Sequence, residues 1–308
     1  MHFADRLHER VTRLNSHLVI GVDPDPRRLF GHDSLLLKAF PRRDMSYILE
    51  KFCFMALEAA AETACAVKPQ AAFFESMGIP GLEVLKRLVD GARSRGIPVI
   101  FDAKRGDIGN TAHAYAEAYL GPNAWLRVDA LTVNPYLGPD TLEPFIQAAN
   151  SSETGLFVLV KTSNPGSGAF QDALMSDGRT LYSKVAEGVD EAGAHNVGEC
   201  GYSNIGAVCG ATYPQELGIL RKLMPRTVFL VPGYGAQGGT AGDVVEAFNP
   251  GGTGAIVSAS RSIIFAYQKK DAEPDPEVMS LAVLSAAKAA KEDIEKAAAL
   301  KSRLNTST

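Results

Sequence analysis

The sequence predicts an α/β protein of the (β/α)8 TIM-barrel class, folded as a single catalytic domain over residues 1–308. Eight short apolar runs rich in β-branched residues alternate with amphipathic stretches along the chain. This alternation is typical of parallel βα units, and eight such units close naturally into a barrel. Barrels of this length are commonly undivided. Because alternation alone also fits an open doubly wound sheet, that fold is the alternative.

The predicted strands are the short apolar runs, and turn residues or helical stretches separate them. They are His17–Asp23, Cys65–Pro69, Pro98–Asp102, Ala130–Asn134, Leu156–Lys161, Asn204–Cys209, Thr227–Val231 and Gly254–Ser258. Between these runs, apolar residues recur at helical spacing. The predicted helices are Met45–Thr63, Gly81–Arg95, Asn110–Leu120, Leu181–Ala192, Tyr213–Leu223 and Gly242–Ala247.

Two stretches lie outside this alternation. Pro276–Leu304 is rich in Ala, Lys and Glu and predicts an extra C-terminal helix, with a charged face that is either solvated or binds a partner. The stretch from Ser163 to Asn204 contains several glycines and predicts an extended loop before its helix. Long loops after barrel strands often cover a site, but a passive insertion is equally compatible with this pattern.

Composition limits the classes of partner. The net charge is −4 and no basic stripe occurs, which argues against nucleic acid. Residues 1–17 carry charges throughout and lack the apolar core of a secretory signal. No apolar run approaches the ~18 residues of a membrane span. The four cysteines form no CxxC pair, and we expect buried thiols rather than a metal site or disulfides. We therefore expect a cytoplasmic protein without a nucleic-acid or membrane partner.

Charged residues end the first three predicted strands. Asp102 and Lys104 are two positions apart, so in an extended strand both side chains would point into the barrel mouth. Lys68 and Asp23 end the two preceding strands. In a barrel, such strand ends meet at the C-terminal face, where active sites of this fold lie. The four charges would therefore alternate around one corner of the mouth; a structural ion pair is the alternative for Asp102 and Lys104 alone.

A second cluster of signals follows strands seven and eight. Val231–Gly239 contains four glycines, which let the backbone approach a ligand closely, and Arg261 follows strand eight. Loops at these positions of a barrel frequently bind phosphate through backbone N–H groups and an arginine. The sequence therefore predicts a phosphorylated small-molecule substrate. A flexible turn beside a surface arginine is the alternative.

The segment Asp102–Ala112, DAKRGDIGNTA, closely resembles the DxKxxD signature of orotidine 5′-phosphate decarboxylases, in the form found in the longer bacterial subgroup. Six further blocks resemble the same family, in family order, across almost the whole chain. They are VIGVDPDP (Val19–Pro26), AVKPQAAFFE (Ala66–Glu75), VNPYLG (Val133–Gly138), KTSNPG (Lys161–Gly166), VPGYGAQGG (Val231–Gly239) and SASRSI (Ser258–Ile263).

The resemblance implies an activity and a set of site residues. It implies decarboxylation of orotidine 5′-monophosphate to UMP and CO2 in de novo pyrimidine biosynthesis, by a homodimer that uses neither metal nor organic cofactor. Lys104 would donate the proton to C6 of the pyrimidine, and Asp102 would lie beside the substrate carboxylate. Lys68 would complete the charge network and contact the ribose, and Asp23 would contact the ribose hydroxyls.

The resemblance also implies contacts beyond the charge cluster. Asp107, with Ile108 and Thr111, would project across the dimer interface into the partner's site. Ser163 would contact the pyrimidine ring. The remaining substrate contacts would come from the loops after strands seven and eight; they are Pro232, with Gln237 and Arg261 on the phosphate.

Three other functions are alternatives to decarboxylation. Related barrel enzymes that share DxKxxD use Mg2+ and need a carboxylate ligand at the end of strand two, but Lys68 stands there and would repel the ion. A Schiff-base aldolase using Lys104 or Lys161 is a weaker alternative, which borohydride trapping would reveal. A catalytically silent phosphate-ligand binder is disfavoured because unneeded buried charges are costly.

Overall fold

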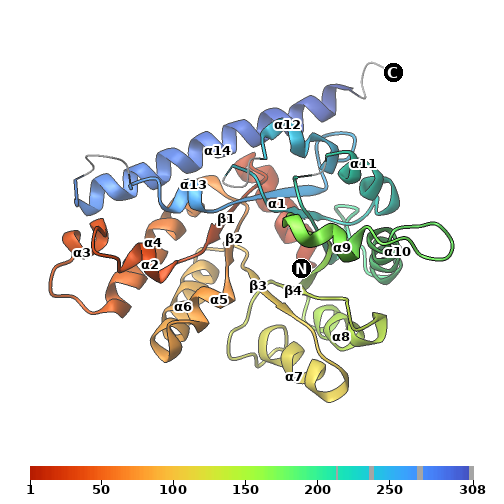
Figure 1. The fold of residues 1–308 in the computed structure, drawn as a ribbon, viewed down its shortest axis with the longest axis horizontal. Coiled ribbons are helices and arrows are strands. Elements are labelled where there is room, and N and C mark those ends of the chain that lie inside the picture. The colour runs from red at the N-terminus through yellow and green to blue at the C-terminus, as the bar shows by residue number, and fades with distance from the viewer. Residues whose placement is uncertain (213, 236–238, 269–272, 305–308) are drawn as a thin grey trace.

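Eight parallel strands form the centre of the computed structural model, which describes all residues except 213, 236–238, 269–272 and 305–308 (Figure 1). Hydrogen-bonded neighbours follow the order β2-β1-β8-β7-β6-β5-β4-β3, and bridges Val67–Val99 and Gln70–Asp102 connect β2 with the β3 segment. The sheet therefore closes into the predicted barrel rather than the open alternative. The strands are β1 (Leu18–Val22), β2 (Ala66–Pro69), β3 (Ile100–Arg105), β4 (Ala130–Val133), β5 (Gly155–Lys161), β6 (Ile205–Cys209), β7 (Phe229–Val231) and β8 (Ala255–Ala259).

Helices surround the barrel and cover its outer face (Figure 1). The α-helices are α1 (Phe3–Leu14), α2 (Pro26–Leu29), α3 (Leu35–Ala39), α4 (Met45–Thr63), α5 (Ala71–Glu75), α6 (Gly78–Ser94), α7 (Gly109–Tyr119), α8 (Glu143–Ser151), α9 (Gly168–Gln171), α10 (Leu181–Gly193), α11 (Pro214–Leu223), α12 (Ala241–Val244), α13 (Arg261–Ile264) and α14 (Pro276–Leu304). Short 3-10 helices are η1 (Pro139–Thr141), η2 (Pro165–Ser167) and η3 (Val245–Ala247).

The eight predicted strands are confirmed, with ends that differ by at most three residues. The predicted helix Met45–Thr63 is confirmed at both ends, and its start is fixed by Asp44, which accepts a hydrogen bond from Tyr47 N at 2.8 Å. The predicted C-terminal helix is α14, which packs along α4. The predicted helix over residues 242–247 is instead α12 followed by η3.

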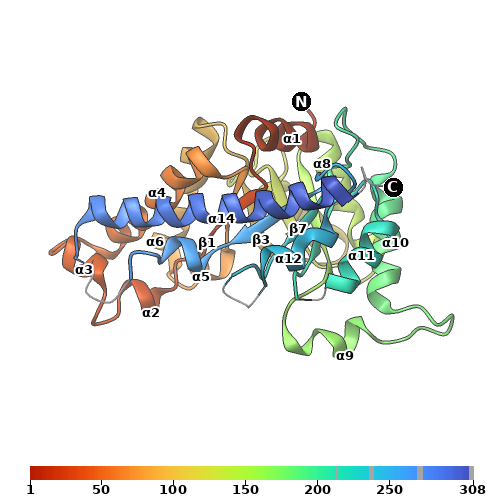
Figure 2. The same ribbon diagram turned by 90° about the horizontal axis from the view of Figure 1, so that it is seen from above.

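The sequence interpretation missed α1, which packs at the N-terminal end of the barrel, opposite α9 (Figure 2). Its apolar residues Phe3, Leu7 and Val11 recur every fourth position and are buried against the strand interiors. The Phe3 ring meets the Phe157 ring edge to face at a centroid distance of 6.1 Å. Charged residues are frequent in this segment, so the helical spacing of its few apolar residues was not recognised from the sequence.

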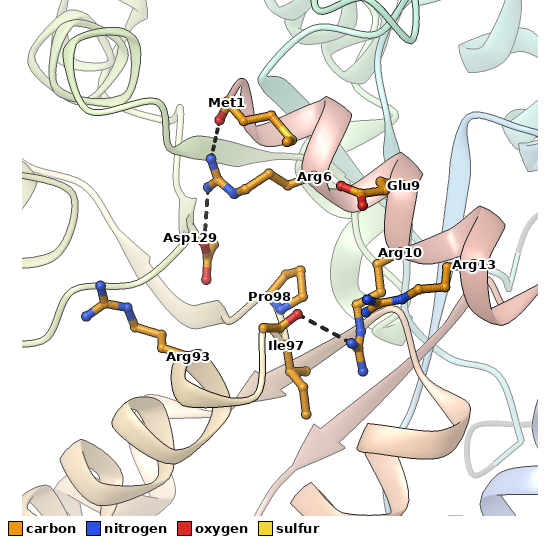
Figure 3. Close-up of a pocket in the computed structure, with 10 residues that line it drawn as sticks. Met1, Arg6, Glu9, Arg10, Arg13, Arg93, Ile97, Pro98 and Asp129 are labelled. Atoms are coloured by element: carbon orange, nitrogen blue, oxygen red, sulfur yellow. Dashed lines mark hydrogen bonds and ion pairs between the residues drawn. The ribbon is translucent and has the colours of Figure 1, made fainter.

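Arginines supply much of the lining of a pocket of about 300 Å³ beside α1 (Figure 3). The buried Arg10 donates hydrogen bonds to the carbonyl oxygens of Ala60 at 3.2 Å and Ala64 at 3.1 Å, at the end of α4, and of Gly96 at 3.3 Å, after α6. Burial lowers the pKa of Arg10, and the neighbouring Arg13 lowers it further. Since helix C-termini carry partial negative charge, these bonds offset that cost and tie α1 to two barrel helices.

The stretch between Ser163 and Asn204 is more structured than the predicted extended loop. It contains η2 and α9 before the predicted helix α10, and α9 projects from the C-terminal end of the barrel (Figure 2). Within the described parts of the chain, no helix is both long and apolar enough to span a membrane.

Candidate active site

The carboxylate of Asp102, in β3, lies at the centre of a charge cluster. Its Oδ2 accepts hydrogen bonds from Lys68 Nζ at 2.7 Å and Gln70 Nε2 at 3.1 Å. Its Oδ1 accepts from Lys104 Nζ at 2.5 Å and Thr132 Oγ1 at 3.0 Å. Burial alone would raise the pKa of this carboxyl, but the two ammonium groups hold the pKa well below its usual range. Asp102 is therefore an ionised carboxylate between two cations.

Lys68 is the buried cation of the cluster, in β2 next to β1. Burial lowers the pKa of its ammonium group, but attraction to Asp102 and Asp23 outweighs burial and raises the pKa. Asp23 directly follows β1, and its Oδ2 accepts a hydrogen bond from Ser260 Oγ at 2.7 Å. Its Oδ1 is buried and accepts no hydrogen bond from the described residues. A buried acceptor without a donor is costly, so a ligand hydroxyl here would be favourable.

Lys104 pairs with Asp102 from an irregular backbone, whereas the sequence predicted a regular extended strand there. Lys104 has a φ of 47°, and the pairing of β3 with β4 shifts register between Phe101 and Arg105. Its backbone N–H donates to Thr132 Oγ1 at 2.9 Å. The expected ion pair therefore forms through a left-handed residue whose backbone is fixed by the neighbouring strand.

Sequence reasoning missed two members of this cluster, Gln70 and Thr132. Gln70 follows β2 directly, so it is another polar residue at a strand end and could have been found by the signal that selected Lys68. Thr132 lies inside β4 among apolar residues. Because threonine is a common strand residue, nothing local distinguishes it from a packing residue.

The loops predicted to hold phosphate follow the neighbouring strands β7 and β8. A side chain added at Gly235 would come within 3.3 Å of Ser262 Oγ, so the loop after β7 packs against the start of α13. Pro232 is half-buried, and its carbonyl oxygen accepts a hydrogen bond from Ala211 N at 3.0 Å. Arg261 is exposed at the first position of α13. Gln237 lies outside the described residues.

Asp107, Ile108 and Thr111 lie on the rim beyond the cluster, where β3 leads into α7. Asp107 Oδ1 accepts a hydrogen bond from Ile108 N at 2.8 Å. Among the described residues, Asp107 makes no hydrogen bond to Asp102 or Lys104. Ile108 and Thr111 are exposed. The structure thus places these three residues together, without a hydrogen bond from Asp107 to the charge cluster among the described residues.

Ser163 follows β5 on the far side of the barrel from β1 in strand order. It is half-buried and packs closely on Gly210, where an added side chain would come within 3.0 Å of Ser163 N. Thr212 Oγ1 donates to the Ser163 carbonyl oxygen at 3.5 Å. Ser163 is therefore held by the loop after β6, at the same barrel face as the charge cluster.

Known proteins resemble this chain over most of its length. The model of the orotidine 5′-phosphate decarboxylase / HUMPS family matches residues 16–273. The orotidine 5′-phosphate decarboxylase of Rhodopirellula baltica is 46% identical over 279 residues, which cover 88% of this chain and 91% of the relative. That of Deinococcus radiodurans is 43% identical over 264 residues, covering 86% and 89%. The structure of Leishmania donovani OMP decarboxylase has a TM-score of 0.74 at 33% identity and covers 97% of this chain and 99% of that one.

The fold and the site define a (β/α)8-barrel protein with an ionised Asp–Lys cluster at the C-terminal face. The extent of the match places it more narrowly. The chain belongs to the orotidine 5′-phosphate decarboxylase / HUMPS family.

Proposed function

We propose that this protein decarboxylates orotidine 5′-monophosphate to UMP and CO2, the step that completes UMP in de novo pyrimidine biosynthesis. The observation that carries the proposal is the ionised Asp102 bound by both Lys68 and Lys104 at the barrel mouth. The relatives named orotidine 5′-phosphate decarboxylase, at up to 46% identity, support it.

The chemistry requires fixed charges, because the reaction leaves an electron pair on C6 of the pyrimidine. The C6–carboxylate bond breaks, CO2 departs as a neutral molecule, and the electron pair stays on C6. The Lys104 ammonium stabilises that pair and then transfers its proton to C6, which gives UMP. Charges already held in place cost little reorganisation during the reaction. Asp102 fixes the Lys104 ammonium group and lies beside the substrate carboxylate, whose charge is lost as CO2 leaves.

Substrate binding divides between two sides of the mouth. The free Oδ1 of Asp23 would accept a ribose hydroxyl beside Lys68. Pro232, Gln237 and Arg261 would hold the phosphate at the ends of β7 and β8, which neighbour β1. Phosphate binding far from C6 supplies free energy that holds the reacting ring in place.

A magnesium-dependent reaction, as implied for related barrel enzymes that share DxKxxD, is the second candidate, because the matched family model is named for HUMPS as well as for orotidine 5′-phosphate decarboxylase. It is disfavoured because the Lys68 ammonium occupies the end of β2 and donates to Asp102. The Lys68 ammonium would repel Mg2+, and it already binds Asp102 Oδ2, an oxygen that could otherwise ligate the metal.

We also propose that the protein is a homodimer and that it resides in the cytoplasm. Apolar side chains in the connections that leave β2, β3 and β4 are each more than half exposed, which suits an interface; they are Ile79, Ile108, Tyr136 and Leu137. The four cysteines are free thiols, which suits a reducing compartment.

The test is a spectrophotometric assay of the purified protein with orotidine 5′-monophosphate, with and without EDTA. We expect loss of substrate absorbance at the same rate in both. Activity abolished by EDTA would instead support the magnesium-dependent alternative, and tight UMP binding without turnover would support a silent binder.

A further inference from the structure

Lys161 ends β5 with a buried ammonium group that the proposed chemistry does not use. Its side chain is 2% exposed and forms ion pairs with two acidic residues. It donates a short hydrogen bond to Asp172 Oδ1, and Glu216 Oε2 lies 3.5 Å from Nζ. The Tyr182 ring lies 5.1 Å from the same atom. A lysine is rarely buried unless its charge is compensated, and here the two carboxylates compensate the charge of Lys161.

The partners of Lys161 come from different elements. Asp172 directly follows α9, in the segment that leaves β5, whereas Glu216 lies in the first turn of α11. Burial raises the pKa of Glu216, although Lys161 partly offsets the rise, and Asp172 raises it further. The Asp172 carboxylate lies closer to Lys161 Nζ than the Glu216 carboxylate does. Through it, one ammonium group fixes the end of β5 to the projecting segment.

A second side-chain contact closes the segment between Thr162 and Asp172. The Gln171 side chain accepts from Thr162 N at 3.0 Å and donates to Thr162 Oγ1 at 2.9 Å, which closes the same loop beside the ion pair. Between Thr162 and Asp172 only Ser167 is buried, and Phe170 in α9 is 68% exposed, so the segment buries little apolar area. A segment with little buried apolar area opens easily unless polar bonds hold it.

The closed loop carries Ser163 at its start. Gly210 N donates to the Lys161 carbonyl oxygen at 2.8 Å, and Gly210 packs against the Ser163 backbone. Lys161 thus fixes the chain on both sides of Ser163: its backbone is bonded to the end of β6, and its side chain is bonded to Asp172 beyond α9.

We propose that the Lys161–Asp172 ion pair is a positioning device that holds Ser163 against the pyrimidine ring of the substrate. The inference rests on the proposed contact of Ser163 with that ring. Lys161 and Asp172 act through Ser163 and do not touch the reacting atoms. The pair therefore serves recognition of the nucleobase and leaves recognition of ribose and phosphate to the opposite side of the mouth.

The test compares Asp172→Asn with Asp177→Asn. Asp172 is 45% exposed, so its substitution disturbs the fold less than a change at the buried lysine. Asp177 is a matched control, because it is 43% exposed in the same connection and pairs with Arg179 instead. We expect Asp172→Asn to lower kcat/KM for orotidine 5′-monophosphate by about tenfold to hundredfold, as misplacement of a substrate contact can. Asp177→Asn should stay within about twofold of the unchanged protein.

Inhibition by ribose 5-phosphate separates positioning from general damage. This probe lacks the base, so its inhibition constant should change by no more than about twofold in Asp172→Asn. An equal loss of affinity for ribose 5-phosphate and for substrate would overturn the proposal, because it would indicate damage to the whole site.

Ser163→Ala and its combination with Asp172→Asn complete the test. If the ion pair acts through Ser163, both single variants lose activity and the double variant loses no more than Ser163→Ala. The positioning role would be overturned if the losses of the two single variants multiplied in the double variant, or if Asp172→Asn were as active as Asp177→Asn. Either result would leave the proposed contact of Ser163 with the ring intact. Full activity of Ser163→Ala would show that the Ser163 side chain makes no needed contact with the ring, and the positioning proposal would then fail as well. The unchanged protein, assayed in parallel, reports on decarboxylation itself.

Discussion

Thr132 connects the backbone of Lys104 to the carboxylate of Asp102. A residue other than glycine with a φ of 47° carries about 1–3 kcal/mol of strain and persists only where its surroundings fix it. The Thr132 hydroxyl accepts from Lys104 N at 2.9 Å and donates to Asp102 Oδ1 at 3.0 Å. One hydroxyl therefore holds both the strained backbone and the orientation of the carboxylate.

Thr132→Val should therefore impair turnover more than binding. Valine has the same shape but cannot make either hydrogen bond, so Lys104 would be held less firmly beside C6. We expect kcat to fall by about tenfold to hundredfold while UMP affinity stays within about threefold. Steady-state kinetics and calorimetric titration with UMP measure the two effects.

Thr154→Val is the matched control for this substitution. Thr154 is also buried, but its Oγ1 has no hydrogen-bond partner among the described residues. The control should keep normal kcat. Equal kcat values for Thr132→Val and Thr154→Val would show that the Thr132 bonds do not position Lys104.

Asp102 should make stability depend on pH in the acid range. Its folded pKa is depressed, so its contribution to the free energy of unfolding is present above the unfolded pKa of about 3.9 and is lost as the pH falls toward the folded pKa. The stability advantage of the unchanged protein over Asp102→Asn should therefore shrink as the pH falls below about 4. Urea unfolding at a series of pH values measures it.

The exposed Asp33 provides the control for this titration. Asp33→Asn should differ little from the unchanged protein at every pH. A constant stability difference for Asp102→Asn down to about pH 3 would contradict a depressed pKa, because an ordinary carboxyl is largely protonated there.

At the scale of elements, local pattern was sufficient for the strands and for the long helices. Apolar runs bounded by turn residues located β1 to β8, and helical spacing located α4 and α14 at both ends. Local pattern was insufficient where contacts between residues far apart in the sequence determine the local structure. The helix α1 forms because its apolar face meets strand interiors, and the left-handed Lys104 depends on a hydroxyl from β4. The partners of Lys161 are 11 and 55 positions away, as the numbers of Asp172 and Glu216 show, so no spacing rule pairs them.

The contact of α1 with the barrel depends on Gly155 at the start of β5. A side chain added there would come within 2.2 Å of the Phe3 ring, so Gly155→Ala should push α1 away from the barrel. We expect the free energy of unfolding to fall by about 1–3 kcal/mol, as overpacking does in other cores. Urea unfolding measures the loss, and kcat should change little because the charge cluster lies at the other end of the strands.

Gly188→Ala is the control, since Gly188 lies in α10 and an added side chain would meet nothing within 4 Å. Alanine there should leave stability unchanged or raise it by up to about 1 kcal/mol. If Gly155→Ala were as stable as this control, docking of α1 would not depend on close approach at Gly155.

At the scale of the whole molecule, the barrel brings residues far apart in sequence to one face, and α14 packs along α4 on its outside. We propose that the chain is one folding domain on this basis. Asp107 lies in the connection that leaves β3, next to the exposed Ile108, and makes no hydrogen bond to Asp102 or Lys104 among the described residues. We propose that this carboxylate completes the site of a second subunit.

Mixing two inactive variants tests this shared site. Lys104→Ala removes the proton donor, and Asp107→Ala removes the carboxylate proposed for the partner's site. In a heterodimer of the two, one site carries both changes and the other carries neither. Because random exchange makes half of all dimers heterodimers, the mixture should regain about one quarter of the normal activity per subunit. Distinct affinity tags on the two variants allow the heterodimer to be isolated, and it should show about half of the normal activity. If the isolated heterodimer is no more active than the two parent variants, Asp107 does not complete the site of a second subunit. The exposed apolar side chains near the ends of β2, β3 and β4 would then need another explanation than a shared active site.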